Sequence, residues 1–155
     1  MCTALASSPQ LRWSLAGEYD ALGDPAKAAE ILARGLQDEA THAQRAALLD
    51  KAGDKAGLAA LYAELRREAT HPSPLRRLLL GQVAELLERR DEALGWYANV
   101  PGEEGQGIAR LRSANVMFQL QRKQEAFAAL RAMQSEAALD EDARRDAYLL
   151  EAELR

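Results

Sequence analysis

The sequence predicts an all-α protein made of antiparallel helix pairs. Hydrophobic residues make up 48% of the chain and aromatic residues only 5%. Much of the chain consists of Ala, Leu, Glu, Arg and Gln, which are strong helix formers, and no segment alternates strictly between apolar and polar residues as a strand would. Three alanines at similar places in the pattern, Ala28, Ala93 and Ala126, are spaced by 65 and 33 residues, about two repeats and one repeat. A helical repeat protein is therefore expected, without a β-sheet.

The first helix pair is predicted within a single repeat domain over residues 9–155, after a loose leader over residues 1–8, because 155 residues suggest one domain. Pro9 suits the start of a helix that runs to Leu22. In Gly23-Asp24-Pro25, the glycine ends this helix, the aspartate caps the next and the proline occupies its first position. The predicted second helix carries Ala28, Ile31, Leu32 and Leu36.

The second pair follows the same plan. A third helix is predicted over about Thr41 to Ala52, and Gly53-Asp54 repeats the earlier turn. The predicted fourth helix carries Leu58, Leu61, Tyr62 and Leu65. Two prolines in Thr70–Pro74 disfavour helix there, so this segment is expected to be a connection of ordinary length or a domain hinge.

The third pair, within Leu78–Tyr97, has the clearest pattern. Gly81 removes a side chain where a neighbouring helix could approach closely. Glu88–Asp91 is a charged break, after which small Ala93 precedes bulky Tyr97 by four residues, as in interdigitating antiparallel helices. The apolar stripe of its first helix consists of Leu80, Val83, Ala84 and Leu87.

The last part of the chain predicts three more helices. Val100–Gly107 is interpreted as a Pro/Gly turn. The seventh helix carries Ile108, Leu111, Ala114, Met117, Phe118 and Leu120. The eighth carries Ala126, Phe127, Leu130 and Met133. Asp140 is expected to cap a ninth helix through Ala143, Ala147, Tyr148, Leu150 and Leu154.

These residues resemble the tetratricopeptide repeat, a helix–turn–helix of about 34 residues with the pattern W-x2-L-G-x2-Y…A-x3-F. Leu80-Gly81 fits the L-G, Ala93…Tyr97 fits A-x3-F, and Glu88 stands where a turn glycine is usual. The first pair matches in order at Leu15-Ala16, Tyr19, Gly23, Ala28 and Leu32. The resemblance covers about residues 11–155 and implies a right-handed superhelix (α-solenoid) of about four helix pairs plus a final helix.

A narrower likeness, carried by residues 78–100 and 147–155, is to tetratricopeptide proteins of proteobacterial envelopes, some of which are lipoproteins that act as protease adaptors. That likeness implies a periplasmic or outer-membrane-attached protein if the chain is part of a longer one. The sequence as given predicts a cytoplasmic protein, because only Met1 precedes the single cysteine, Cys2. No apolar run approaches the ~20 residues needed to span a membrane.

The resemblance also implies a binding surface, because the first helix of each pair lines a concave groove in such arrays. The expected groove residues are Trp13, Asp20, Gln82, Glu85, Asn115, Phe118, Arg144 and Tyr148, with Gly17, Leu78 and Leu111 at neighbouring groove positions. Asn115 matches an asparagine that clamps a carboxylate in some members, but Leu78 and Leu111 replace two of the accompanying basic residues. An extended or helical protein segment, held by apolar and polar contacts, is the expected partner. The competing interpretation assigns these residues to the core or to a solvated face.

The predicted function is therefore a non-catalytic adaptor or scaffold that uses no cofactor, with homo-oligomerisation left open. A net charge of -4 argues against nucleic acid as the partner. One alternative is a structural spacer, or a fragment of a larger envelope protein. A remote alternative is a helical di-metal enzyme built on Glu39-x-x-His42 and Glu68-x-x-His71, although both motifs lie at helix boundaries. Gly102–Gly107 lacks the order of a dinucleotide or phosphate-loop fingerprint and is interpreted as a turn.

Overall fold

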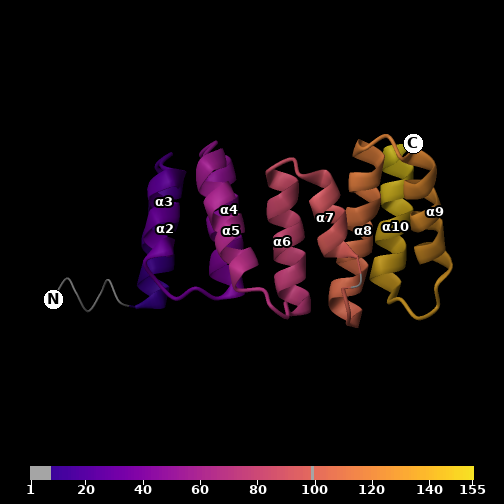
Figure 1. Cartoon of the computed structure of the whole chain (residues 1–155), viewed down its shortest axis with the longest axis horizontal. Helices are drawn as coiled ribbons and strands as arrows, with labels where there is room; N and C mark the ends of the chain where they lie inside the picture. Colours follow the sequence, from indigo (N-terminus) through magenta and orange to yellow (C-terminus); the bar gives the residue numbers. More distant parts are fainter. Residues whose placement is uncertain (1–7, 99) are drawn as a thin grey trace. The chain divides into compact units, whose positions relative to one another are not determined.

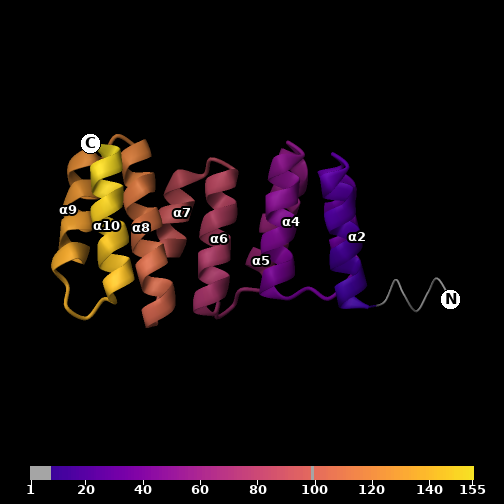
Figure 2. The same ribbon diagram turned by 180° about the vertical axis from the view of Figure 1, so that it is seen from behind.

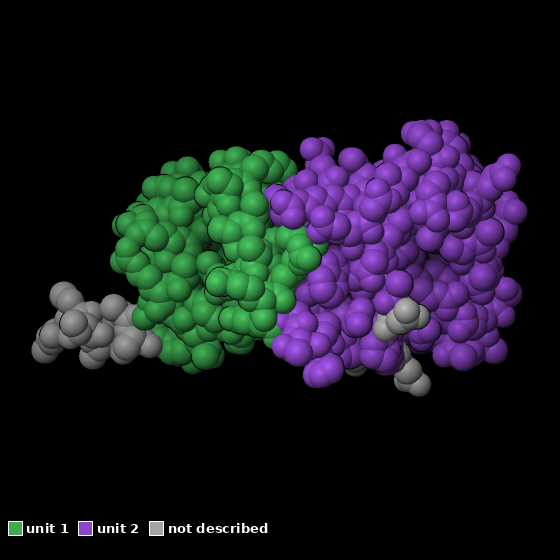
Figure 3. Space-filling model, in the orientation of Figure 1, with its two compact units in different colours: residues 1–68 green, residues 69–155 purple. Residues whose placement is uncertain are grey.

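The computed structural model describes residues 8–98 and 100–155, without the side chains of 103 and 104. The described residues form nine α-helices and contain no strand, which confirms the all-α prediction (Figure 1). The chain divides into two compact units, Met1–Glu68 and Ala69–Arg155, which Figure 3 colours separately. The boundary falls just before the proline-containing connection at 70–74. The leader predicted over residues 1–8, including Cys2, lies almost entirely outside the described residues.

Unit 1 consists of four helices, each of which packs against the next. They are α2 (Pro9–Ala21), α3 (Pro25–Ala33), α4 (Glu39–Lys51) and α5 (Lys55–Arg67). The core around α3 joins Ala16 of α2 to Leu32 of α3 and Leu48 of α4. Aspartates fix the helix starts, because Asp24 accepts a hydrogen bond from the backbone N–H of Lys27 and Asp54 accepts one from Gly57. These bonds satisfy backbone donors that the first turn of a helix leaves without partners.

The prediction that the second helix includes Leu36 is wrong, because α3 ends at Ala33 and Leu36 lies in the following connection with 65% of its surface exposed. Gln37 provides the physical reason. Its Nε2 atom donates to the carbonyl oxygens of Leu32 at 3.0 Å, Ala33 at 3.2 Å and Gly35 at 2.7 Å. The side-chain amide thus adds a donor for carbonyls at and after the end of the helix, where Leu32 also accepts the N–H of Gly35 at 3.2 Å.

Unit 2 consists of α6 (Pro74–Leu86), α7 (Arg90–Tyr97), α8 (Glu103–Gln119), α9 (Lys123–Ser135) and α10 (Glu141–Leu154). The hairpins α6–α7 and α8–α9 are each joined by a tight turn (Figure 1). The final helix α10 packs against both α8 and α9 (Figure 2). The core of this end of the unit contains Ala114, Leu130, Met133, Leu139, Ala143 and Ala147.

Gly81 lies at a close helix contact, as its place in the pattern predicts. A Cβ atom built on Gly81 would lie 2.7 Å from both Cδ1 and Cζ of Tyr97, well inside van der Waals contact. Tyr97 is 3% exposed, and Ala93, one turn earlier on α7, is fully buried. The missing side chain on α6 therefore makes room for the large ring on α7.

The prediction of a turn through Gly107 is wrong, because α8 already begins at Glu103. Gly105 and Gly107 are helical residues in close contacts. A Cβ on Gly105 would lie 3.1 Å from Cγ1 of Val100, and one on Gly107 would lie 3.2 Å from Cβ of Ala143. Glycine lowers helix propensity here but permits close approach of neighbouring segments, and this packing role has the same sequence appearance as a flexible turn.

One turn geometry recurs in all four helix pairs. Gly23, Gly53, Glu88 and Gln121 adopt positive φ angles of 86°, 70°, 60° and 65°. Each of these residues follows the previous one by close to one repeat length. In each turn the next residue donates its N–H to a carbonyl five positions earlier, at 2.8–2.9 Å, as from Asp24 to Tyr19 and from Arg89 to Ala84. This bond is typical of a Schellman helix end, which favours glycine at the left-handed position, yet two of the four turns form without glycine.

A buried small residue stands seven positions before each left-handed residue. These residues are Ala16, Ala46, Gly81 and Ala114. Ala147 of α10, which stands one repeat length after Ala114, is also fully buried. The turns and the buried small residues therefore mark the same internal repeat in both units.

Candidate functional site

The predicted groove residues lie on four helices, divided between the two units. Trp13 and Asp20 lie on α2 of unit 1. The others lie on α6, α8 and α10 of unit 2 and are Gln82, Glu85, Asn115, Phe118, Arg144 and Tyr148. Within unit 2, α8 contacts both α6 and α10, so these three helices lie next to one another. A single groove along the whole chain remains a prediction.

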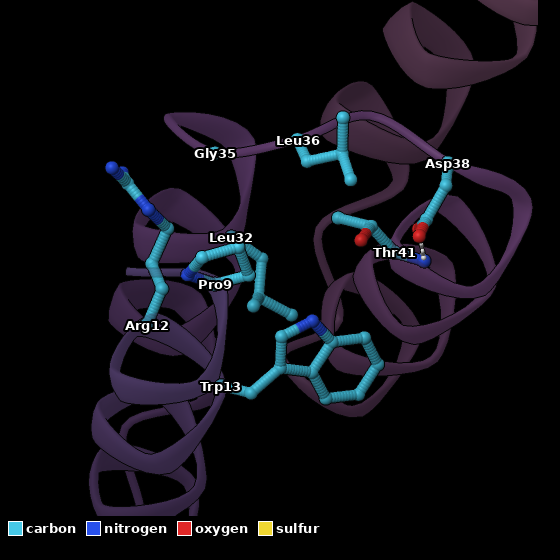
Figure 4. Close-up of a pocket in the computed structure, with 8 residues that line it drawn as sticks. All are labelled: Pro9, Arg12, Trp13, Leu32, Gly35, Leu36, Asp38 and Thr41. Atoms are coloured by element: carbon cyan, nitrogen blue, oxygen red, sulfur yellow. Dashed lines mark hydrogen bonds between the residues drawn. The ribbon is translucent and has the colours of Figure 1, made fainter. Parts of the chain in front are cut away.

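Trp13 lines a hollow within unit 1 (Figure 4). The hollow contains about 270 Å³ of empty space, which includes space open to solvent, and the Trp13 indole and the Leu36 side chain lie on opposite sides of it. Trp13 is 40% exposed, although its large apolar surface would favour burial. The residues that line the hollow are Pro9, Arg12, Trp13, Leu32, Gly35, Leu36, Asp38 and Thr41. Of the two predicted groove residues in unit 1, Trp13 is thus the one that borders a hollow.

Asp20 is engaged in an ion pair between helices. Its Oδ1 atom lies 2.6 Å from Nζ of Lys51, so the carboxylate joins α2 to α4. Both side chains remain partly exposed, and exposed pairs of this kind contribute little net stability. Asp20 therefore presents a neutralised pair on the surface of unit 1.

Glu85 fastens three helices of unit 2 together. Its carboxylate accepts a hydrogen bond from the Tyr97 hydroxyl on α7 and lies 3.3 Å from Nη1 of Arg112 on α8. Burial of the ring and the negative charge of Glu85 raise the pKa of the Tyr97 hydroxyl well above its ordinary value. Tyr97 therefore stays neutral and donates, and Glu85 acts in packing. Gln82, three positions earlier on α6, is half-buried.

Phe118 also makes contacts within its own helix pair. Its ring meets that of Phe127 on α9 edge to face, with centroids 6.0 Å apart, and Nζ of Lys123 lies 5.3 Å from the centroid of Phe118. Such aromatic pairs add about 0.5–1.5 kcal/mol beyond the area they bury. Asn115, one turn earlier on α8, is half-buried.

The two predicted residues on α10 differ in exposure. Arg144 is half-buried, with its Nε atom out of contact with solvent. Tyr148 is 65% exposed and lies beside Leu149, which is 56% exposed. Of the six predicted groove residues in unit 2, Tyr148 presents the largest exposed apolar surface.

Sequence analysis missed Glu151, which is buried on α10 between partners from two helices. It receives hydrogen bonds from Arg155 at 2.6 Å, from Gln134 at 2.7 Å and from Arg131 at 3.0 Å. These donors lower the pKa of the Glu151 carboxyl from 4.5 to about 2. Glu151 follows Phe118, a predicted groove residue, by one repeat length, so it stands at the equivalent position of its helix. A glutamate in a helix with many charged residues nevertheless gives no sequence signal of burial.

The histidines of the two Glu-x-x-His motifs belong to different units. His42 is buried near the start of α4, and His71 is exposed in the connection before α6. Among residues 8–98 and 100–155, no group of three or more His, Cys, Asp or Glu side chains could hold a metal ion. No helix in the described ranges is long and apolar enough to cross a membrane.

Comparison of the chain with protein-family models, curated proteins and solved structures gave no match. The function is therefore inferred from the arrangement of the described helices and from the burial and charge of their side chains.

Proposed function

We propose that this chain is a non-catalytic binding module of the tetratricopeptide type, whose helix pairs stack as a right-handed superhelix. The shared turn geometry, which recurs at close to one repeat length, supports the repeat, as does the buried small residue seven positions before each turn. In this proposal, the first helices present side chains to a segment of a partner protein, and no bond is made or broken.

The half-exposed Trp13 at its hollow is the observation that carries this proposal. Tryptophan and arginine are enriched among the residues that dominate binding energy, and such residues act best when a pocket excludes water around them. The hollow contains both residue types, because Arg12 and Trp13 line it together with the exposed Leu36. An apolar side chain from an extended partner segment fits a hollow of this composition. Within unit 2, Tyr148 on α10 is an exposed aromatic residue, while Phe118 supports helix packing.

Selection of random dodecapeptides displayed on phage, with the full chain as bait, tests this proposal. The peptides enriched on the unsubstituted chain should include a set that binds Trp13→Ala at least about tenfold more weakly, the loss expected for an interface residue that contributes more than about 1.4 kcal/mol. Leu22→Ala is the matched control, because Leu22, directly after α2, is 80% exposed but does not line the hollow. Circular dichroism melting should show that both variants remain folded.

Two results would contradict the proposal. If every enriched peptide binds Trp13→Ala as tightly as the unsubstituted chain, the hollow is not a binding site. A complete failure to enrich peptides would favour a structural spacer.

A further inference from the structure

A second cleft lies in unit 2 between α7 and α8, away from the residues predicted for the groove. It encloses about 800 Å³ of space, part of which is open to solvent. One wall is a stripe along α8, formed by Gln106, Arg110, Ser113 and Met117. The remaining lining residues are Leu94, Tyr97, Ala98, Val100 and Arg122.

The short length of α7 explains the cleft. α7 has 8 residues, whereas α9, its equivalent in the next pair, has 13. Five residues correspond to about 7 Å of helix, so α7 leaves part of the flank of α8 uncovered. Ala98 turns the chain into an extended conformation with ψ 131°. Val100, which precedes Met133 by one repeat length, is buried as Met133 is.

The residues along α8 deepen the cleft. Ser113 stands one repeat length after Leu80, which is fully buried on α6. A hydroxymethyl group at this position fills much less volume than the isobutyl group of leucine. On α7, the Tyr97 ring lies against Gly81 and its hydroxyl is bonded to Glu85, so the ring is held toward α6 and cannot fill the space beside α8.

Two of the residues that line the cleft are cationic. Of its nine lining residues, Arg110 and Arg122 are the ionised ones, and no carboxylate is among them. Each arginine has a glutamate partner outside the cleft. Arg110 uses Nη1 to bond Glu136 at 2.5 Å, and Arg122 uses Nε and Nη2 to bond Glu125 at 2.8 and 2.6 Å. Since a guanidinium has five N–H donors, both keep donors for a second acceptor.

The backbone positions of the two arginines are separated along the α8 stripe. Met117 follows Arg110 by seven helical positions, about 10 Å, and the N–H of Arg122 returns to the Met117 carbonyl. In an extended peptide, about three residues span the same distance. Leu94, Tyr97 and Met117 contribute apolar surface to the same cleft.

We propose that this cleft binds an extended acidic segment of a partner protein, with an apolar side chain placed between two carboxylates about three positions apart. The apolar side chain enters the space between Leu94 and Met117. The carboxylates accept hydrogen bonds from Arg110 and Arg122, and the polar side chains of Gln106 and Ser113 bond the peptide backbone. This site is independent of the Trp13 hollow, because all its lining residues belong to unit 2.

The test uses the full chain carrying Trp13→Ala, so that the hollow of unit 1 does not contribute. Phage-displayed random dodecapeptides are selected on this bait, and the affinities of enriched peptides are measured by fluorescence anisotropy. We expect sequences with two Asp or Glu residues about three positions apart around a Leu, Ile, Met or Phe. Their binding should weaken at least about tenfold in Arg110→Gln/Arg122→Gln, since hydrogen bonds between charged groups are lost. It should also weaken with added salt.

Two further variants separate binding from folding. Ser113→Phe places a ring in the cleft, so it should abolish binding while the melting temperature is maintained or raised. Arg145→Gln is the matched control, because Arg145 is an exposed arginine of unit 2 that pairs with Asp142 and does not line the cleft. Arg145→Gln should bind as the bait does. The inference is overturned if no peptide is enriched, if the enriched peptides lack acidic residues, or if they bind the double glutamine or Ser113→Phe variant with unchanged affinity.

Discussion

The two units build the same turn from different residues. In unit 1, Gly23 and Gly53 occupy the left-handed position, whereas in unit 2 Glu88 and Gln121 occupy it with nearly the same φ. A side chain in this conformation costs about 1–2 kcal/mol. The hydrogen bonds at the helix end form in all four turns. These bonds and the packing of the helix pair therefore determine the turn, and glycine lowers its cost.

Three glycines of unit 2 have a different role from the turn glycines of unit 1. Gly81, Gly105 and Gly107 lie inside helices where another segment approaches closely. At the turns within its helix pairs, unit 1 thus uses glycine for backbone conformation, whereas unit 2 uses glycine inside its helices for packing. The following substitutions test this division, beginning with the largest expected effect.

Gly81→Leu should destabilise the protein most, by about 1–3 kcal/mol, because the new side chain would overlap the Tyr97 ring. Chemical denaturation monitored by circular dichroism measures the loss. Gly95→Leu is the matched control, since Gly95 lies on α7 with no neighbouring atom within 4 Å of its Cβ direction. Equal melting temperatures for Gly81→Leu and the unsubstituted protein would refute the packing role.

Substitutions at the left-handed positions of the two units should change the stability of the protein in opposite directions. Gly53→Ala places a Cβ at φ 70° and should cost about 1–2 kcal/mol. Glu88→Gly removes a Cβ at φ 60° and should stabilise unit 2 by up to about 1 kcal/mol, less than the reverse change costs because glycine also loses more entropy on folding. Thermal melts of both variants provide the measurement. A loss of stability in Glu88→Gly would show that the Glu88 side chain contributes contacts that outweigh the strain.

The two units also differ in the residue that follows the left-handed position and precedes the next helix. Asp54 accepts a hydrogen bond from the Gly57 N–H at 2.8 Å, whereas the Arg89 side chain makes no such bond to the start of α7. Asp54→Ala should cost about 1 kcal/mol, and Arg89→Ser should gain up to about 1 kcal/mol. Asp54→Asn is the control, because asparagine caps equally well and lacks the charge. If Asp54→Asn loses as much stability as Asp54→Ala, the contribution comes from charge instead of the cap.

Glu151 should give unit 2 an acid sensitivity confined to low pH. Its folded pKa of about 2 lies below the ordinary 4.5, so the carboxylate contributes its full stabilisation above pH 4.5. This contribution is lost as the pH falls from 4.5 towards 2, because the unfolded chain binds the proton first. Urea denaturation at pH 7, 4 and 3 should show a smaller pH dependence in Glu151→Gln than in the unsubstituted protein. An identical pH dependence would contradict the buried ion network.

The helices and their turns could be predicted from sequence because the signals are local. Proline, aspartate and glycine at 23–25 mark the end and the start of helices by their own backbone chemistry. The contact of Gly81 with Tyr97 was also predictable, since a small residue and a bulky one recur at fixed positions of an antiparallel pair. The prediction for Leu36 followed its apolar spacing from Leu32, although Gly35 is a signal of a helix end. The bonds from the Gln37 side chain to carbonyls there had no sequence signal.

The candidate sites were less predictable because they depend on contacts between helices. Phe118 and Trp13 are both aromatic residues at predicted groove positions, and the sequence pattern does not distinguish them. In the structure, Phe118 packs on Phe127, whereas Trp13 remains 40% exposed at a hollow. The α7–α8 cleft arises from the early end of α7, which Pro101 and Gly102 mark in the sequence, but the space left beside α8 depends on how the two helices pack. Gly105 and Gly107 gave a misleading turn signal because packing and flexibility require the same residue.

The side chain of Gln37 has a consequence for the speed of recognition. Its amide group bonds three carbonyls at the end of α3, and its Oε1 atom accepts from Nη1 of Arg45 at 2.7 Å. The segment that carries Leu36 is therefore held before any partner arrives. A partner that enters the Trp13 hollow meets a preorganised rim, and the ordering entropy of about 1–2 kcal/mol per backbone residue has already been lost during folding. Association can then proceed without a slow rearrangement, at rates typical of rigid surfaces.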